Sequence, residues 1–538
     1  AGLVAAAGVL RLTSQMLTIA AAVIEGVSTW LPTGKAGTAR WGGRRDIAPE
    51  LSRRKQRKKG PFWGLAMDAQ DTPLFIDYVS NAMTVAPAGS GKGVASVVPM
   101  GLSIRDSKVL CDLKGELVCI LKKPLEARGE RVRVLNPAGL FRARVGEGES
   151  FSPLDTIADD LHRPGGLLDV PGDLRELAAQ LLPELAGKES DHTYFREGSR
   201  RAIAMACLLE AMVEAYDATL SSVALLIENR EAFEHHLRWV AGVDLDGKPL
   251  SGGPMPIAHT PWAHHHDPAD LAEFTALIQA WATNWLALMS QADGKTFESF
   301  LSGAQQALAP FAFGRLAPAM RRSTFRMADL KDGQQATSMF IVADSSRMEV
   351  FKPWLGLMQW CAMTAIKRHP DHQRPVYFIM DEATNYRVHG LESLLTWGRG
   401  YGLRLHLIFQ DLSAFERTYG KTALETLLSE TEIKQFLPGQ RSPKTLEMIS
   451  KMLGEQSVMA ASLSREDEGL REQMSEAGRP LMTPEEVRRA SHGVLLVRKA
   501  RPLRIEPVSY AAVHPWRSQA DINPFHGKPY RKKVRLRL

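Results

Sequence analysis

The chain has 538 residues, of which 44% are hydrophobic and 24% are charged, and its formal net charge is +7. This is the composition of an ordinary globular protein, and the length predicts two to four domains rather than one. The four cysteines are scattered without a CxxC pair, which argues against a structural zinc site and is typical of a reduced, cytosolic chain.

The amino-terminal part, residues 1–60, is interpreted as a membrane-proximal linker. Its apolar run at 16–24 is too short to span a bilayer, which takes about 20 apolar residues. Because the chain opens on alanine, we expect that a transmembrane part has been removed upstream. The basic run at 53–59 is expected to lie against an anionic membrane surface; a contact with a phosphate backbone and a solvated linker are the alternatives.

From residue 61 onward the pattern changes to short apolar strands that alternate with helical stretches. We assign 61–159 to the first part of a nucleotide-binding domain, with strands at 83–86, 108–112 and 131–135. The same rhythm returns in a second part at 326–515, with strands at 339–342, 376–381, 403–409 and 433–437. Such alternation predicts an α/β fold with a mainly parallel sheet.

Between these two parts the sequence is rich in Ala, Leu and Met at helical spacing, which predicts an inserted all-α domain at 160–325. Late in the chain, 466–477 is charged and is predicted to be helical, whereas 493–508 reads as a final pair of strands. Residues 516–538 form a basic tail, with its basic run at 531–537.

Residues 86–93 read APAGSGKG, follow an apolar strand and open a helix, which is the setting of a phosphate-binding loop. Glycines let backbone N–H groups cradle phosphate oxygens, and the Lys92 ammonium reaches the β and γ phosphates of ATP. The first glycine of the usual motif is replaced by Ala86, and Gly93 stands where a hydroxyl normally holds magnesium. A glycine-rich turn with an exposed lysine is the alternative. The predicted nucleotide-binding residues are Pro87, Ala88, Gly89, Ser90, Gly91, Lys92, Gly93 and Val94.

Asp381 and Glu382 end a second, buried-type strand. In phosphoryl transfer the first acid orients hydrated Mg²⁺, and the second polarises the attacking water as a general base. We therefore predict that Asp381 holds Mg²⁺ through water and that Lys92, Asp381 and Glu382 support ATP hydrolysis.

Two further residues are catalytic candidates. Gln410 ends the next strand and could sense the γ-phosphate beside Glu382, or it could be an ordinary polar residue at a strand terminus. Arg399 lies on a glycine-flanked turn and could neutralise transition-state charge in a neighbouring subunit's site. A capping or salt-bridging arginine is the alternative.

Taken together, these motifs resemble the type IV coupling proteins of the TraG/TraD class, which deliver DNA or protein to conjugation and type IV secretion channels. The resemblance runs in order from about residue 37 to 510. It rests on GTARW at 37–41, SGKGV at 90–94, DLKGEL at 112–117, FSPLD at 151–155, MDE at 380–382, RGYG at 399–402, QDL at 410–412 and GRPLMTPEE at 478–486. Lysine followed by glycine in the phosphate loop looks like a form that this family uses.

The resemblance implies a RecA-like P-loop ATPase that uses ATP and Mg²⁺ and assembles as a homo-hexameric ring at the cytoplasmic face of the bacterial inner membrane. Implied partners are single-stranded DNA, relaxase or effector protein substrates, and components of the type IV secretion channel. Lys114 and Glu116 match a family segment expected near the nucleotide. The alternatives are a recruitment platform that binds nucleotide with little motor activity, and a related DNA-pumping motor.

Overall fold

The computed structural model describes residues 34–51, 60–184, 193–250, 257, 260–291, 294–466, 469–527 and 533–538. The apolar run at 16–24, the basic run at 53–59 and the start of the basic run at 531–537 lie outside the described residues. Within the described ranges no helix has both the length and the apolar character that crossing a bilayer requires.

A single eleven-stranded sheet organises the molecule, in the order β2-β1-β13-β12-β9-β3-β8-β7-β4-β6-β5. Its seven consecutive strands from β9 to β5 are all parallel. They are β3 (Asn81–Val85), β4 (Ser107–Asp112), β5 (Arg131–Leu135), β6 (Thr337–Val342), β7 (Val376–Met380), β8 (Leu403–Phe409) and β9 (Thr431–Phe436). All seven correspond to strands that the sequence pattern predicts, and the mainly parallel α/β fold is confirmed.

The central strands β3, β8, β7, β4 and β6 are almost entirely buried on both faces, as a parallel sheet covered by helices requires, whereas β5 and β9 are partly exposed. Successive side chains point to opposite faces, so Met83 belongs to one hydrophobic core while its neighbour Ala82 belongs to the other. The shorter helices outside the insertion are α2 (Arg44–Ile47), α3 (Val98–Ser103), α4 (Glu116–Ala127), α5 (Arg142–Val145), α15 (Leu391–Trp397), α16 (Leu412–Tyr419), α17 (Lys421–Glu430), α18 (Pro443–Leu453), α19 (Pro484–Arg489) and α20 (Trp516–Gln519). A separate two-stranded sheet pairs β14 (Val513–His514) with β15 (Leu536–Arg537).

Four antiparallel strands extend the sheet beyond β9. They are β1 (Phe62–Ala66), β2 (Thr72–Phe75), β12 (Gly493–Val497) and β13 (Leu503–Glu506). The two late strands are the pair predicted at 493–508, whereas β1 and β2 were not predicted. Trp516 packs edge-on against Phe62, with ring centroids 5.2 Å apart, so the end of the chain covers this part of the sheet.

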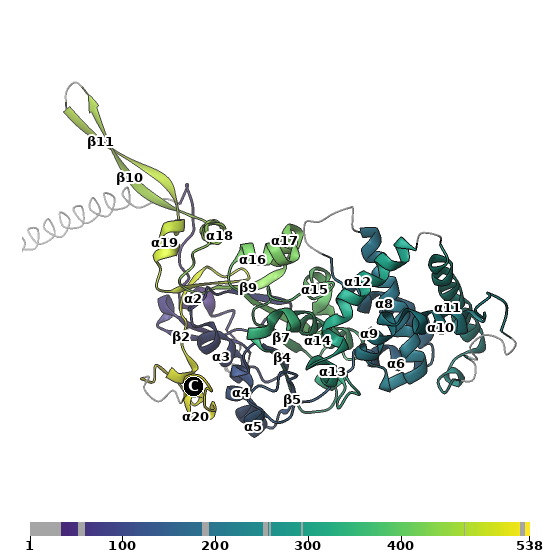
Figure 1. Ribbon diagram of the computed structural model, residues 1–538. Coiled ribbons are helices and arrows are strands. Elements are labelled where there is room, and N and C mark those ends of the chain that lie inside the picture. The colour runs from purple at the N-terminus through teal and green to yellow at the C-terminus, as the bar shows by residue number, and fades with distance from the viewer. Residues whose placement is uncertain are drawn as a thin grey trace, which may run out of the picture.

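A long hairpin, β10 (Glu455–Glu466) with β11 (Gly469–Pro480), projects away from the sheet (Figure 1). The helix predicted at 466–477 is therefore wrong. Twelve antiparallel residue pairs join the two strands, and this backbone pairing outweighs a helix propensity that is only a weak local preference. At the hairpin's base, the Ser457 N–H donates to the carbonyl of Gly37 at 3.0 Å.

The segment between β5 and β6 is helical, which confirms the inserted all-α unit as part of the fold; its exact bounds at 160 and 325 stay a prediction. Its helices are α6 (Asp155–His162), α7 (Val170–Leu181), α8 (Thr193–Glu214), α9 (Leu220–Glu228), α10 (Arg230–Ala241), α11 (Pro268–Met289), α12 (Lys295–Ala312) and α13 (Leu316–Ala319). Figure 1 shows this bundle to one side of the sheet. Its core is continuous with one face of the sheet, through α14 (Met348–Arg368).

Candidate nucleotide site

The phosphate loop connects β3, near the middle of the sheet, to the helix that follows. The Ala86 N–H donates to the Phe409 carbonyl of β8 at 2.8 Å, and the Leu437 N–H donates to the Val85 carbonyl at 3.0 Å. The start of the loop is thereby held on both sides, to the end of β8 and to the residue that follows β9. Gly89 and Gly91 have φ of +80° and +78°, a left-handed conformation that side-chain-bearing residues adopt only at a cost.

The loop has free donors and open space. The N–H groups of Ala88, Gly89 and Gly91 donate to no other residue in the part of the chain that the structure describes. A Cβ placed at Gly89 or Gly93 would meet nothing within 4 Å, and the buried Ser90 hydroxyl has no hydrogen-bond partner among the described residues. These unsatisfied groups fit a chain of phosphate oxygens.

The helix after the loop begins with one π turn, Gly93–Val97, and continues as α3. Single π turns often occur at functional sites. The Ala95 N–H bonds back to the Gly91 carbonyl at 2.9 Å, which joins the loop to the first turn. The positive end of this helix therefore faces the same space as the loop's free donors.

Lys92 is bonded to both predicted acids. Its Nζ lies 3.0 Å from Oδ1 of Asp381, and it also contacts Oε1 of Glu382. The acids directly follow β7, which is separated from β3 by β8 alone. Since parallel strands place their carboxyl ends at one edge of the sheet, residues about 290 positions apart meet there.

Glu382 has a left-handed backbone with φ of +51°. For a residue with a side chain, this conformation costs roughly 1–2 kcal/mol. It is held by two hydrogen bonds: the Glu382 N–H donates to Oδ1 of Asp381 at 3.0 Å, and the Ala383 N–H donates to the Ile408 carbonyl at 2.9 Å. This strained turn lets consecutive acids both reach Lys92.

The charges in this cluster shift one another's titration. Burial raises the pKa of Asp381, and the neighbouring charge of Glu382 adds to that effect while Lys92 opposes it. Burial lowers the pKa of Lys92, but the two carboxylates outweigh it and the pKa of Lys92 is raised. The lysine is therefore held in its charged form, which is the form that binds phosphate.

Gln410 lies beside Glu382, with its Nε2 3.5 Å from Oε2 of that acid. It is exposed and directly follows β8. The next residue, Asp411, caps α16 by accepting the Ala414 N–H at 2.9 Å. The structure therefore brings Lys92, Asp381, Glu382 and Gln410 together.

Arg399 is not part of this cluster. It lies in a 3₁₀ turn, Gly398–Tyr401, that precedes β8, whereas Gln410 follows the same strand. The two residues therefore lie at opposite edges of the sheet. Arg399 is exposed and forms no ion pair with any described residue. Within one chain it cannot reach the Lys92 cluster.

A buried polar layer that the sequence did not reveal lies beneath the loop. The Thr84 hydroxyl donates to Oε1 of Gln435 at 2.9 Å, and the Ser96 hydroxyl donates to the same oxygen at 3.3 Å. His406 Nε2 lies 2.7 Å from Thr84 Oγ1, and because that hydroxyl already donates, the imidazole must be the donor. Burial lowers the pKa of His406 to about 3, so the ring is neutral and bonds β8 to β3.

Lys114 and Glu116 lie just after β4, at the same edge of the sheet as the phosphate loop. Asp112 precedes them and accepts the N–H groups of Lys114 at 3.2 Å and Val118 at 2.9 Å, so it shapes the start of α4. Glu116 accepts a hydrogen bond from Asn523 at 2.6 Å, while Lys114 is exposed.

Known proteins of two kinds resemble this chain in sequence. VirD4 of Rhizobium radiobacter is 26% identical over 500 residues, which cover 88% of this chain and 64% of that protein. The chain therefore spans just under two thirds of the length of VirD4. The conjugal transfer protein TraG of Escherichia coli is 26% identical over 496 residues, covering 84% of this chain and 72% of TraG.

Among solved structures, the bacterial conjugative coupling protein TrwBdeltaN70 in complex with sulphate has the same fold. It superposes with a TM-score of 0.57 at 15% identity, covering 89% of this chain and 96% of that one. The complex of TrwB with a non-hydrolysable ATP analogue gives a TM-score of 0.56 at 16% identity, with the same coverage. The chain thus shares the RecA-like α/β fold of these structures.

One family covers most of the chain. The family described as type IV secretory system conjugative DNA transfer matches residues 36–167 and 268–520, which include every strand of the large sheet and the Lys92 cluster. The unmatched stretch between them carries α7 to α10 of the helical insertion. The chain belongs to the family of type IV secretory system conjugative DNA transfer proteins.

Proposed function

We propose that this protein is a coupling-protein ATPase that recruits DNA–relaxase complexes or protein substrates to a type IV secretion channel and drives their transfer by ATP hydrolysis. The observation that carries the proposal is the contact of Lys92 with both Asp381 and Glu382 at the end of the phosphate loop. A structural role alone does not explain a lysine shared by two acids beside unsatisfied loop donors.

In the proposed reaction, the loop N–H groups and Lys92 bind the phosphates of ATP. Asp381 holds hydrated Mg²⁺, which neutralises charge on the β and γ phosphates when it is bound. One carboxylate with waters and phosphates is a sufficient magnesium ligand set, so Gly93 need not supply a hydroxyl. Glu382 accepts a proton from the attacking water, and Gln410 orients that water from the far side of the carboxylate.

The solved relatives support nucleotide and magnesium binding. TrwB has been crystallised with ADP and Mg²⁺ and with non-hydrolysable analogues of ATP and of GTP. Those proteins share the fold, and the family match includes the residues of the Lys92 cluster. Transfer of this property to the chain is part of our proposal.

We further propose a homo-hexameric ring at the cytoplasmic face of the bacterial inner membrane, in which Arg399 reaches the site of a neighbouring subunit. Its exposed guanidinium, without an ion pair in the described part of the chain, supports a partner outside the subunit. The family match supplies the context of type IV secretion, and the similarity to the conjugal transfer protein TraG supplies that of conjugation. The mild excess of positive charge, +7 overall, suits contact with single-stranded DNA and with anionic lipid.

The test is ATP turnover by the purified chain with and without single-stranded DNA. We expect hydrolysis that DNA stimulates, and loss of hydrolysis in Lys92→Ala with the fold intact. DNA binding should weaken steeply as salt rises, because phosphate contacts release counterions. Nucleotide binding without turnover in the assembled ring would instead favour the recruitment platform, and undiminished turnover by Lys92→Ala would contradict the site.

A further inference from the structure

A cavity of about 660 Å³ lies within the helical insertion and is separate from the Lys92 cluster. Its walls come from α7, α8, α11 and α12, together with His389, which belongs to the segment that follows β7. Residues far apart in the sequence therefore enclose one space. Its volume is that of a small-ligand site.

One side of the cavity is apolar and aromatic. Trp281 and Trp285 lie one turn apart on α11, and Phe300 of α12 faces them. The Trp285 and Phe300 rings meet edge-on with their centroids 6.2 Å apart, and Trp285 is only 6% exposed. This wall offers a flat or aliphatic group a preformed apolar surface.

The other side of the cavity is cationic. Arg200 is buried, and its Nη2 has no hydrogen-bond partner among the described residues. Its Nη1 contacts Glu197 at 2.5 Å. Arg175 and Arg201 also line the cavity, are exposed, and form no ion pair in the described ranges.

The two acids of the lining are already neutralised. Glu197 pairs with Arg200, whose Nη1 also lies 3.6 Å from Glu184, and Glu176 pairs with Lys367 at 3.5 Å. The lining itself has three arginines and two glutamates, so it keeps an excess of positive charge. A ligand that complements it needs an anionic group at one end and an apolar body at the other.

We propose that this cavity binds a carboxylate carried on an aromatic or aliphatic body, either a free small molecule or the end or side chain of a protein. A guanidinium pairs with a carboxylate through two parallel hydrogen bonds, while the tryptophan wall receives the apolar body. A single anionic group suits an enclosed space with one cationic side better than a nucleic-acid strand, which carries a charge on every nucleotide.

The cavity is joined to the Lys92 cluster by residues 383–390, which directly follow Glu382. Gln180 of α7, only 3% exposed, uses both ends of its amide on this segment. Its Nε2 donates to the Arg387 carbonyl at 3.2 Å, and its Oε1 accepts the His389 N–H at 2.7 Å. A side chain displaced at His389 therefore acts on the same backbone that carries Glu382.

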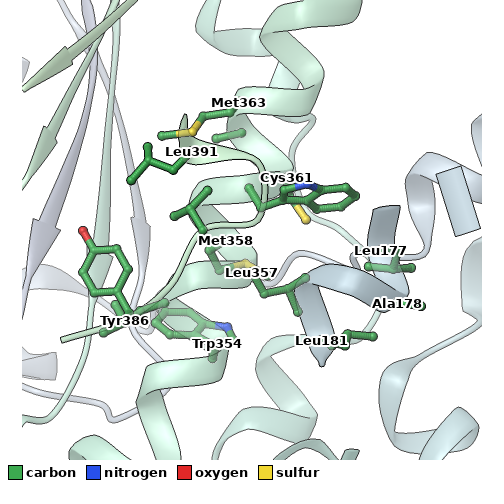
Figure 2. Close-up of a cluster of buried hydrophobic side chains, with 14 of the residues drawn as sticks. Leu177, Ala178, Leu181, Trp354, Leu357, Met358, Cys361, Met363, Tyr386 and Leu391 are labelled. Atoms are coloured by element: carbon green, nitrogen blue, oxygen red, sulfur yellow. The ribbon is translucent and has the colours of Figure 1, made fainter. Parts of the chain in front are cut away.

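The surrounding packing makes this connection stiff. Figure 2 shows Leu177, Ala178 and Leu181 of α7 near α14, with Tyr386 of the 383–390 segment and Leu391 of α15 close to the same helix. On α14, a Cβ at Gly356 would lie 1.9 Å from the Arg387 carbonyl oxygen. The segment cannot move there without moving α14 or α7. Occupancy of the cavity is thus transmitted to Glu382, a step that rests on the proposed function.

Binding is tested first, by isothermal titration of the full chain with naphthoate and with naphthamide, which has the same aromatic body without the charge. We expect naphthoate to bind at least about tenfold more tightly than naphthamide. Arg201→Gln should weaken naphthoate binding severalfold, whereas Arg321→Gln, which changes an exposed arginine outside the cavity, should leave it unchanged. Equal binding of the two probes, or no binding, overturns the proposal.

The source of the carboxylate is distinguished by competition. A short peptide with a free terminal carboxylate that displaces naphthoate, while its amidated form does not, assigns the site to proteins. Displacement of naphthoate by neither peptide assigns it to small molecules. Displacement by a phosphorylated thymidine oligonucleotide, but by neither peptide, would overturn the proposal in favour of nucleic acid.

Transmission from the cavity to the Lys92 cluster is tested by measuring the affinity for a non-hydrolysable ATP analogue with and without saturating naphthoate. We expect a shift of about fivefold in the wild type, within the usual range of coupling between sites. Gln180→Met should bind naphthoate normally but lose the shift. An unchanged wild-type affinity overturns transmission, and this titration decides the matter even where Gln180→Met fails to fold. Absence of nucleotide binding with naphthoate binding retained would contradict the proposed function instead.

Discussion

The Lys92 cluster and Arg399 lie at opposite edges of the parallel sheet, and their charges are held in opposite ways. At the carboxyl edge, Lys92, Asp381 and Glu382 are partly buried and bonded to one another. At the amino edge, Arg399 is exposed and has no ion pair with a described residue. Lys92 and Arg399 both lie in glycine-rich turns, and each turn adjoins a strand of the same sheet.

The difference indicates which parts of a reaction one subunit supplies by itself. A strained turn at Glu382 and a burial-raised pKa at Asp381 carry a cost in free energy that a merely structural cluster would avoid. Arg399 bears no such cost, because it is exposed and has no ion pair with a described residue, and its guanidinium is free to act on another molecule. We therefore interpret the carboxyl edge as a complete binding site and the amino edge as its complement in a neighbour.

The largest expected effect is that of Arg399→Ala. If this arginine completes a neighbour's site, turnover by the assembled ring should fall by roughly a thousandfold or more, because a transition-state charge loses its counter-ion. Nucleotide affinity should change little. Mixing variant with wild-type subunits and measuring ATP hydrolysis checks this, since variant subunits should inhibit their wild-type neighbours.

Arg105→Ala is the matched control, because Arg105 is also exposed and also precedes a parallel strand, β4, at the amino edge. Rings that mix Arg105→Ala with wild-type subunits should show no inhibition, so they should retain at least the activity expected from their wild-type subunits. Mixed rings of Arg399→Ala that likewise show no inhibition would make Arg399 an ordinary surface arginine and remove the proposed difference between the two edges.

Glu382→Gln should lower turnover by about a thousandfold while the ATP analogue still binds, because the amide keeps the shape but cannot accept a proton from water. Since the negative charge beside Lys92 is also lost, binding of the analogue should become somewhat tighter. Single-turnover hydrolysis and analogue titration separate the two effects. Near-normal hydrolysis by this variant would show that Glu382 only positions Lys92.

Gln410→Ala should lower turnover by only about tenfold. The Gln410 side chain is uncharged, and it contributes one long hydrogen bond of 3.5 Å to Glu382. Gln410→Asn, which retains the amide on a shorter stem, should recover part of the loss if positioning of the water is the role. An unchanged rate in Gln410→Ala would leave it a polar residue at the end of a strand.

The smallest expected effect is a gain in the apparent affinity for Mg²⁺. A Cβ at Gly93 meets nothing within 4 Å, so Gly93→Ser can add a hydroxyl where Mg²⁺ is expected, and the magnesium concentration for half-maximal turnover should fall about threefold. Gly89→Ser is the contrast, because Gly89 has φ of +80° and a side chain there strains the loop. Lower activity in Gly93→Ser without a change in magnesium dependence would place the metal elsewhere.

The local sequence pattern predicts most of the fold. Short apolar runs that alternate with helical stretches predict all seven parallel strands. The central strands are the clearest, because strands buried on both faces are nearly continuous hydrophobic segments that can be recognised without knowing their neighbours. Glycine spacing likewise predicts the phosphate loop, and the two acids at 381 and 382 are visible as the end of such a strand. The error at 466–477 has the same origin: charged residues favour a helix locally, and only pairing with β10 makes the segment a strand.

Contacts between distant segments were decided by the tertiary structure alone. Sequence predicts Lys92 and Glu382 as one site, but only the order β3-β8-β7 places them within bonding distance. Arg399 and Gln410 are only eleven positions apart in the sequence, but β8 lies between them and separates them by its whole length. The left-handed turn at Glu382, the polar layer at Thr84 and the amide bridge of Gln180 leave no local signal, because each depends on a partner far away in the chain.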